Sequence, residues 1–99
     1  MSLSESLLEQ KAERDRVLQI SESLGEDERQ ILKLVAAGKL NKEIAFEIGI
    51  PLRTLEDRKR RLMTKVGAES VAKMIQFSIR VEEFEQSRAA DLLWNQRRS

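Results

Sequence analysis

Apolar residues recur every three or four positions along most of this 99-residue chain, which is the spacing of a helix with one buried face. Tyrosine is absent and no β-branched residues alternate with polar ones, so nothing in the pattern favours a strand. We therefore predict an all-α fold. The expected helices cover residues 1–23, 26–37, 41–48, 52–66 and 70–80, with a helical continuation over residues 81–99.

Residues 41–66 have the pattern of a short helix, a tight turn and a longer helix. Gly49 stands where the end of a helix favours positive φ, and Pro51 prevents the first helix from continuing and can open the second. The small Ala45, then Gly49 four residues on, then Leu55 six further, is the internal spacing of a helix-turn-helix.

The ends of the other helices also have sequence signals. Gly25 is expected at the N-cap of the helix over 26–37, whose first turn is acidic, and Asn41 is expected to cap the short helix. Gly38 and Gly67 are expected to end the helices that precede them.

Basic residues are concentrated on one predicted helix. The net charge of the chain is only +1, but residues 50–67 hold six basic residues against two acidic ones. The polar face of this segment carries Arg53, Glu56, Asp57, Arg60, Arg61 and Thr64. A solvated face is the simpler explanation for a lone basic helix, but its position as the second helix of a helix-turn-helix favours a nucleic-acid partner.

The composition removes several classes of function. Without cysteine or histidine, the chain has no disulfide, no zinc site built on those ligands and no catalytic pair that depends on them. No cofactor or metal is expected, and the acidic run at residues 82–85 is interpreted as a solvated face, so an enzyme is the weakest hypothesis. No apolar run reaches membrane-spanning length and no signal peptide is recognisable, which predicts a cytoplasmic protein.

Residues 24–80 resemble the LuxR-type helix-turn-helix DNA-binding domain, the output module of FixJ/NarL-like response regulators. The matching residues are Glu28-Arg29, Ile31-Leu32, Val35 to Gly38, Asn41 to Ala45, Gly49-Ile50, Arg53 to Glu56, Met63, Lys65-Val66, Ala68 and Ser70 to Ala72. Residues 1–23 resemble the linker helix that joins such a module to its receiver domain, and residues 81–99 form a C-terminal extension. A receiver domain is not expected within the chain, because strands and helices do not alternate in it.

The resemblance implies a four-helix domain whose third helix enters the major groove of double-stranded DNA. It places Glu56, Asp57 and Arg60 at base-reading positions. The positions that hold phosphates are Lys42, Arg53, Thr54 and Lys65, and Arg61 on the same polar face joins them. Arginine can pair with guanine and a carboxylate can accept from cytosine, although the two acids can equally form a charge pair at the helix start.

The family often has lysine at the position of Glu56, histidine at Arg58 and a polar cap at Pro51. These departures leave the preferred DNA sequence open.

The fourth helix of such domains lies at a dimer interface, which predicts a homodimer. Its core face is expected to hold Val71, Met74, Ile75, Ser78 and Ile79, and its partner face Ala72, Gln76, Phe77 and Arg80. For Phe77 the alternative is that it folds back on the core of its own chain.

The leading hypothesis is the sequence-specific DNA-binding output domain of a two-component response regulator, which regulates transcription as a dimer on two half-sites. A second hypothesis is a protein-interaction module with Phe84, Leu93 and Trp94 as anchors, and a segment like region 4 of a sigma factor is a neighbouring option. The helix over 1–23 has a charged middle and is expected to be partly docked or associated with a partner.

Overall fold

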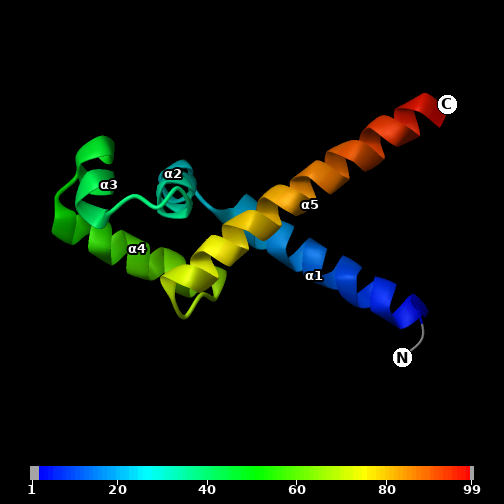
Figure 1. The fold of residues 1–99 in the computed structure, drawn as a ribbon, viewed down its shortest axis with the longest axis horizontal. Coiled ribbons are helices and arrows are strands. Elements are labelled where there is room, and N and C mark those ends of the chain that lie inside the picture. The colour runs from blue at the N-terminus through cyan, green and yellow to red at the C-terminus, as the bar shows by residue number, and fades with distance from the viewer. Residues whose placement is uncertain (1–2, 99) are drawn as a thin grey trace.

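The computed structural model describes the backbone of residues 3–98 and the side chains of residues 9–94 and Gln96. The described chain folds into five helices and contains no strand, which confirms the all-α prediction (Figure 1). The helices are α1 (Leu3–Ser23), α2 (Glu26–Ala36), α3 (Asn41–Ile48), α4 (Leu52–Val66) and α5 (Val71–Arg98).

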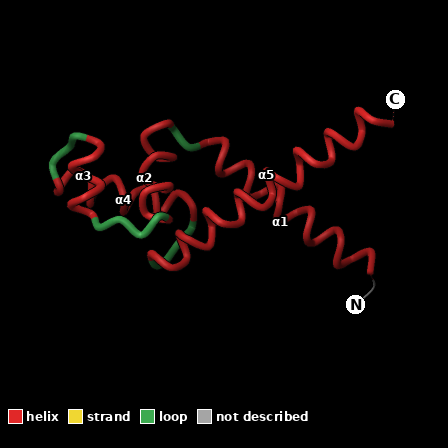
Figure 2. Tube along the Cα trace, turned by 45° about the horizontal axis from the view of Figure 1, so that its top comes forward, coloured by secondary structure: helices red, strands yellow, loops and turns green. Residues whose placement is uncertain are grey.

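The helices form a compact end and two diverging arms. In both views α2, α3, α4 and the first part of α5 lie together, and α1 crosses α5 near the middle of the molecule (Figures 1 and 2). Beyond the crossing, the N-terminal part of α1 and the C-terminal part of α5 point away from each other and from the helix-turn-helix.

One hydrophobic core holds the compact end together. Its fully buried side chains are Ile31, Ile44, Leu55, Leu62 and Met74. These residues come from α2, α3, α4 and α5, so each of the four helices gives at least one side chain to the core. Burial of such side chains is the main source of stability in a domain of this size.

The helix boundaries follow the glycines. Gly38, Gly49 and Gly67 have φ of 81°, 83° and 73°, so each adopts the left-handed conformation that a helix end commonly requires. Gly25 is the N-cap of α2, as expected, but the N-cap of α3 is Leu40. The prediction of Asn41 as that cap is wrong, because Asn41 is already the first helical residue.

The orientation of α5 agrees only in part with the prediction. Met74 and Ile75 pack against the core as predicted, but the other side chains of α5 that pack there are Phe77, Val81 and Phe84. Val71 and Ile79, which were expected on the core face, are 41% and 48% exposed. The reason is that the inward stripe from Met74 to Phe84 continues at three- and four-residue spacing along the helix and can therefore pack against both the domain and α1.

The second half of α1 is part of the folded structure. Val17, Leu18 and Ser21 are buried, and Val17 belongs to the main core. Of the two alternatives for this helix, docking on its own chain is the arrangement observed.

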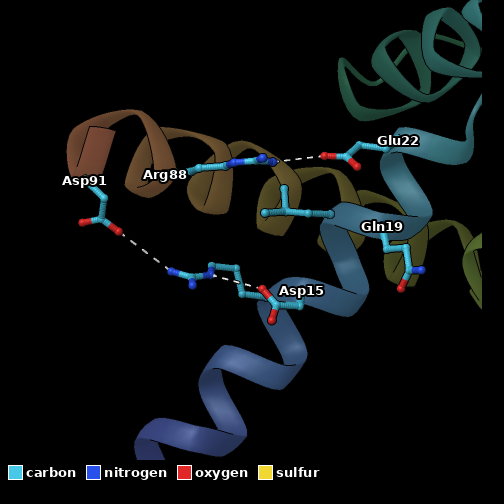
Figure 3. A pocket seen from close by; sticks show the side chains of 7 residues that line it. Asp15, Gln19, Glu22, Arg88 and Asp91 are labelled. Carbon is cyan, nitrogen blue, oxygen red and sulfur yellow. Dashed lines mark hydrogen bonds and ion pairs between the residues drawn. The ribbon is translucent and has the colours of Figure 1, made fainter. Parts of the chain in front are cut away.

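Ion pairs accompany that docking. Arg88 of α5 donates to Glu22 of α1 at 3.1 Å, and Figure 3 shows the two side chains pointing toward each other across an open cleft between the helices. Arg80 of α5 also pairs with Glu13 of α1. These side chains are largely exposed, so the buried apolar residues contribute more to docking than the charges do.

Candidate nucleic-acid interface

The turn between α3 and α4 is built as the sequence indicates. The amides of Gly49 and Ile50 both donate to the carbonyl of Ala45, at 2.9 and 3.0 Å, and close the end of α3. Ala45 is 4% exposed and Leu55 is fully buried, so the small side chain of α3 lies in the same core as the first apolar residue of the α4 inner face. This packing leaves the opposite side of α4 on the surface.

The outer side of α4 carries the predicted base-reading residues. Glu56, Asp57 and Arg60 are all exposed. The Nη1 atom of Arg60 lies 3.7 Å from Oδ1 of Asp57, one turn away on the same helix. Both side chains are more than half exposed, and a pair of this kind is weak enough to be exchanged for another partner.

The predicted phosphate-binding residues differ in how available they are. Lys42, Arg53 and Arg61 are exposed, and none of the three has an ion-pair partner among the described residues. Thr54, which follows Arg53 in the sequence, is half-buried. Lys65 is exposed too, but its ammonium group already donates to Glu28 at 3.0 Å and to the carbonyl of Ser23 at 3.2 Å.

Other cations of α4 are also turned toward the domain. Arg58 lies 3.7 Å from a carboxylate oxygen of Asp27 on α2. The Nζ atom of Lys59 donates to Oδ1 of Asn41 on α3 at 2.8 Å. From the sequence, both residues could be counted only as part of the positive charge of α4, because no local spacing indicates where a long side chain will find its partner.

Two hydrogen bonds perturb the titration of Glu28. The Gly25 amide donates to its carboxylate at 3.0 Å and Lys65 donates to the same oxygen. The first of these hydrogen bonds, with a smaller contribution from Lys65, holds the pKa of Glu28 below its ordinary value despite the opposing effect of burial.

The predicted dimer face is divided between the surface and the core. Ala72 and Gln76 are exposed, as an interface requires, whereas Phe77 is only 8% exposed and lies in the hydrophobic core. Arg80 is held by Glu13 of α1. Assignment of Phe77 to the interface is therefore wrong in this arrangement, because the side chain packs inside its own chain.

The described residues contain no group of three or more carboxylates placed to hold a metal ion. Within the same part of the chain, no helix is both long and apolar enough to cross a membrane.

Comparison with known proteins gives a consistent result. Residues 22–78, more than half of the chain, match the family described as bacterial regulatory proteins, luxR family. The transcriptional regulatory protein TdiR of Thauera aromatica is 30% identical over 80 residues, which are 81% of this chain and 35% of TdiR.

Two solved structures are also similar. The response regulator StyR superimposes with a TM-score of 0.72 at 29% identity, covering 77% of this chain and 38% of that one. Full-length FixJ from B. japonicum gives a TM-score of 0.61 at 32% identity, covering 74% of this chain and 38% of that one. The chain thus spans little more than a third of the length of these relatives.

Proposed function

The chain belongs to the family of bacterial regulatory proteins of the luxR type, and from that premise we propose that it binds double-stranded DNA sequence-specifically. In this proposal it is the output domain of a two-component response regulator, works in the cytoplasm and regulates transcription as a homodimer. The observation that carries the proposal is the two-sided character of α4. Leu55 and Leu62 anchor its inner side with no exposed surface, while its outer side presents charged groups to solvent.

We assign base reading to Arg60, Glu56 and Asp57. The guanidinium of Arg60 suits the paired acceptors of guanine in the major groove, and the carboxylates suit the amino group of cytosine. Arg60 and Asp57 lie 3.7 Å apart in the free protein. The Asp57 carboxylate can therefore orient the guanidinium before DNA arrives, and acidic groups near phosphates penalise binding to unmatched sequences.

We assign phosphate binding to Lys42, Arg53, Thr54 and Arg61. The three cations are exposed and unpaired within the described chain, so they can neutralise phosphates without breaking an internal contact. Lys65 has to leave Glu28 and Ser23 before it reaches a phosphate, so we expect a smaller contribution from it.

The homodimer is proposed to form through the first turns of α5. Val71, Ile75 and Ile79 recur every four residues, and Val71 and Ile79 are 41% and 48% exposed. With the exposed Ala72 and Gln76 and the half-buried Ile75, Val71 and Ile79 form a surface of mixed apolar and polar side chains. Pairing this surface with its copy about a two-fold axis removes the apolar groups from water.

Selection of bound duplexes from a random pool tests the function directly, because it reports binding, the preferred sequence and the spacing of half-sites together. We expect Arg60→Ala to weaken the selected site by about 1–3 kcal/mol and to relax the preference at one base pair. Arg88→Ala is the matched control and should change neither, because Arg88 lies in the C-terminal half of α5 and pairs with Glu22 of α1.

Two results would contradict the proposal. If Arg60→Ala changes neither affinity nor preference, α4 does not read bases through this residue. If the unaltered protein shows no salt-dependent binding to any duplex at low salt, the domain is an interaction module and not a DNA-binding one.

A further inference from the structure

Lys59 is the basic residue of α4 whose side chain forms a hydrogen bond with α3, the other helix of the helix-turn-helix. Its Nζ atom donates to Oδ1 of Asn41 at 2.8 Å, and both residues are half-buried. Asn41 is the first residue of α3, so the hydrogen bond joins the start of one helix to the middle of the other. It is the only side-chain hydrogen bond between α3 and α4 among the described residues.

The position of this hydrogen bond determines what it can do. Ala45 and Leu55 place the two helices in one apolar core. Interdigitated apolar side chains favour one crossing angle, but such angles scatter by about 15–20° between proteins, which leaves room for a further contact to set the angle. Asn41 lies one turn before Ala45 and Lys59 lies one turn after Leu55. The Asn41–Lys59 hydrogen bond therefore lies about 6 Å along each helix from the apolar residues Ala45 and Leu55. Because the two helices are then held at two separate places, the angle between them is restricted.

We propose that the Asn41–Lys59 hydrogen bond sets the angle at which α4 is presented to DNA, and that Lys59 is a positioning residue for base preference and not a phosphate contact. The inference rests on the proposed DNA-binding function. A change in the angle moves Arg60, the adjacent residue, and Glu56, one turn earlier, relative to the base edges. Phosphate contacts made by long, flexible cations tolerate such a change better than bidentate base contacts do.

The chemistry of the pair suits this role. The acceptor is a neutral amide and not a carboxylate, so the hydrogen bond directs Lys59 without cancelling its charge. Lys59 therefore still adds to the positive field of α4, although its ammonium group is turned toward α3.

The salt dependence of binding separates a positioning residue from a phosphate-binding one. Removal of one cation that neutralises a phosphate should make the log–log salt slope shallower by about 0.9. We expect Arg61→Met to produce this change and to leave the order of preferred sequences intact. Lys59→Met should make the slope shallower by clearly less than Arg61→Met does, and it should reduce the discrimination between the best site and its single-base variants on the order of tenfold.

A second variant makes the test independent of any single substitution. Asn41→Ala removes the acceptor and keeps the lysine, so it should reproduce the loss of discrimination, and the double variant should lose no more than either single one. Circular dichroism and thermal unfolding show which variants fold, and Asn41→Ser replaces Asn41→Ala if the latter does not.

The outcomes are distinct. A shallower salt slope for Lys59→Met, equal to that of Arg61→Met, makes Lys59 a phosphate-binding residue and overturns the inference. Unchanged sequence preference in both Lys59→Met and Asn41→Ala also overturns it while the proposed function stands. Failure of the unaltered protein to bind any duplex overturns the proposed function and the inference together.

Discussion

Lys65 on α4 lies 3.0 Å from the carboxylate of Glu28 on α2, although the two residues are 37 positions apart in the chain. The same carboxylate oxygen accepts the amide of Gly25, and the ammonium also reaches the carbonyl of Ser23 at the end of α1. Three helices therefore meet at one ion pair. Glu28 is the acceptor on which both the start of α2 and the last turn of α4 depend.

Because of this ion pair, we expect the free energy of unfolding to depend on pH in the acidic range. Because the pKa of Glu28 is lowered in the folded state, the unfolded chain binds more protons, so the contribution is complete at neutral pH and is lost as the pH falls through the folded pKa. We expect Glu28→Gln to destabilise the protein by about 1 kcal/mol at neutral pH and to flatten its pH dependence below about pH 4.3. Urea unfolding across that range is the measurement.

Glu26→Gln is the matched control, since Glu26 is exposed on the same turn and has no ion-pair partner within the described chain. An equal change of the pH profile in both variants would show that net charge, and not the Glu28 contacts, is responsible.

The N-cap of α3 offers a stabilising substitution. Leu40 is extended, with φ of −74° and ψ of 153°, is 59% exposed and gives no side-chain hydrogen bond to the helix. A serine there can accept from a free amide of the first turn, so we expect Leu40→Ser to raise the free energy of unfolding by about 0.5–1 kcal/mol. Leu40→Ala removes the same apolar surface without a cap and should give no gain, as measured by chemical unfolding.

Truncation of two residues of α3 should change stability by very different amounts. Ile44 is fully buried and Phe46 is 89% exposed on the same helix. Ile44→Ala should cost about 2–5 kcal/mol through reduced burial and a cavity, whereas Phe46→Ala should stay within about 0.5 kcal/mol. Thermal or urea unfolding of both variants compares them, and similar losses would mean that Phe46 is packed in solution.

The proposed dimer face predicts where a charge prevents association. Ile79→Glu places two like charges near the two-fold axis, so we expect the dimer dissociation constant to rise at least tenfold, measured by analytical ultracentrifugation. Leu92→Glu is the control, because Leu92 is 58% exposed on the same helix but lies about 20 Å further along it than Ile79. If Leu92→Glu dissociates the dimer and Ile79→Glu does not, the copies meet through the arms.

Local signals account for what the sequence predicted well. The helix-turn-helix is recognisable because Ala45, Gly49 and Pro51 each have a requirement that acts within a few residues: small size, positive φ and a break in the hydrogen-bond ladder. The outer face of α4 follows from its helical period for the same reason.

Non-local contacts account for what it missed. The helix after Gly67 has apolar residues on two faces, and periodicity alone cannot tell whether Phe77 or Ile79 faces the core. That choice depends on α1, which belongs to a distant part of the sequence and packs against α5. Likewise Lys59 and Lys65 have long side chains whose partners lie on other helices, so the sequence showed their charge but not their direction.

Because α5 is one uninterrupted helix from residue 71 to residue 98, its end suits the attachment of a label. A helix of 28 residues is about 42 Å long, and its far end, like that of α1, stands on the side of the molecule remote from α3 and α4 (Figure 1). A dye or fusion partner joined at either end is therefore held away from the proposed DNA-binding surface. Energy transfer between such a dye and labelled DNA would then measure DNA binding without any change to the outer side of α4.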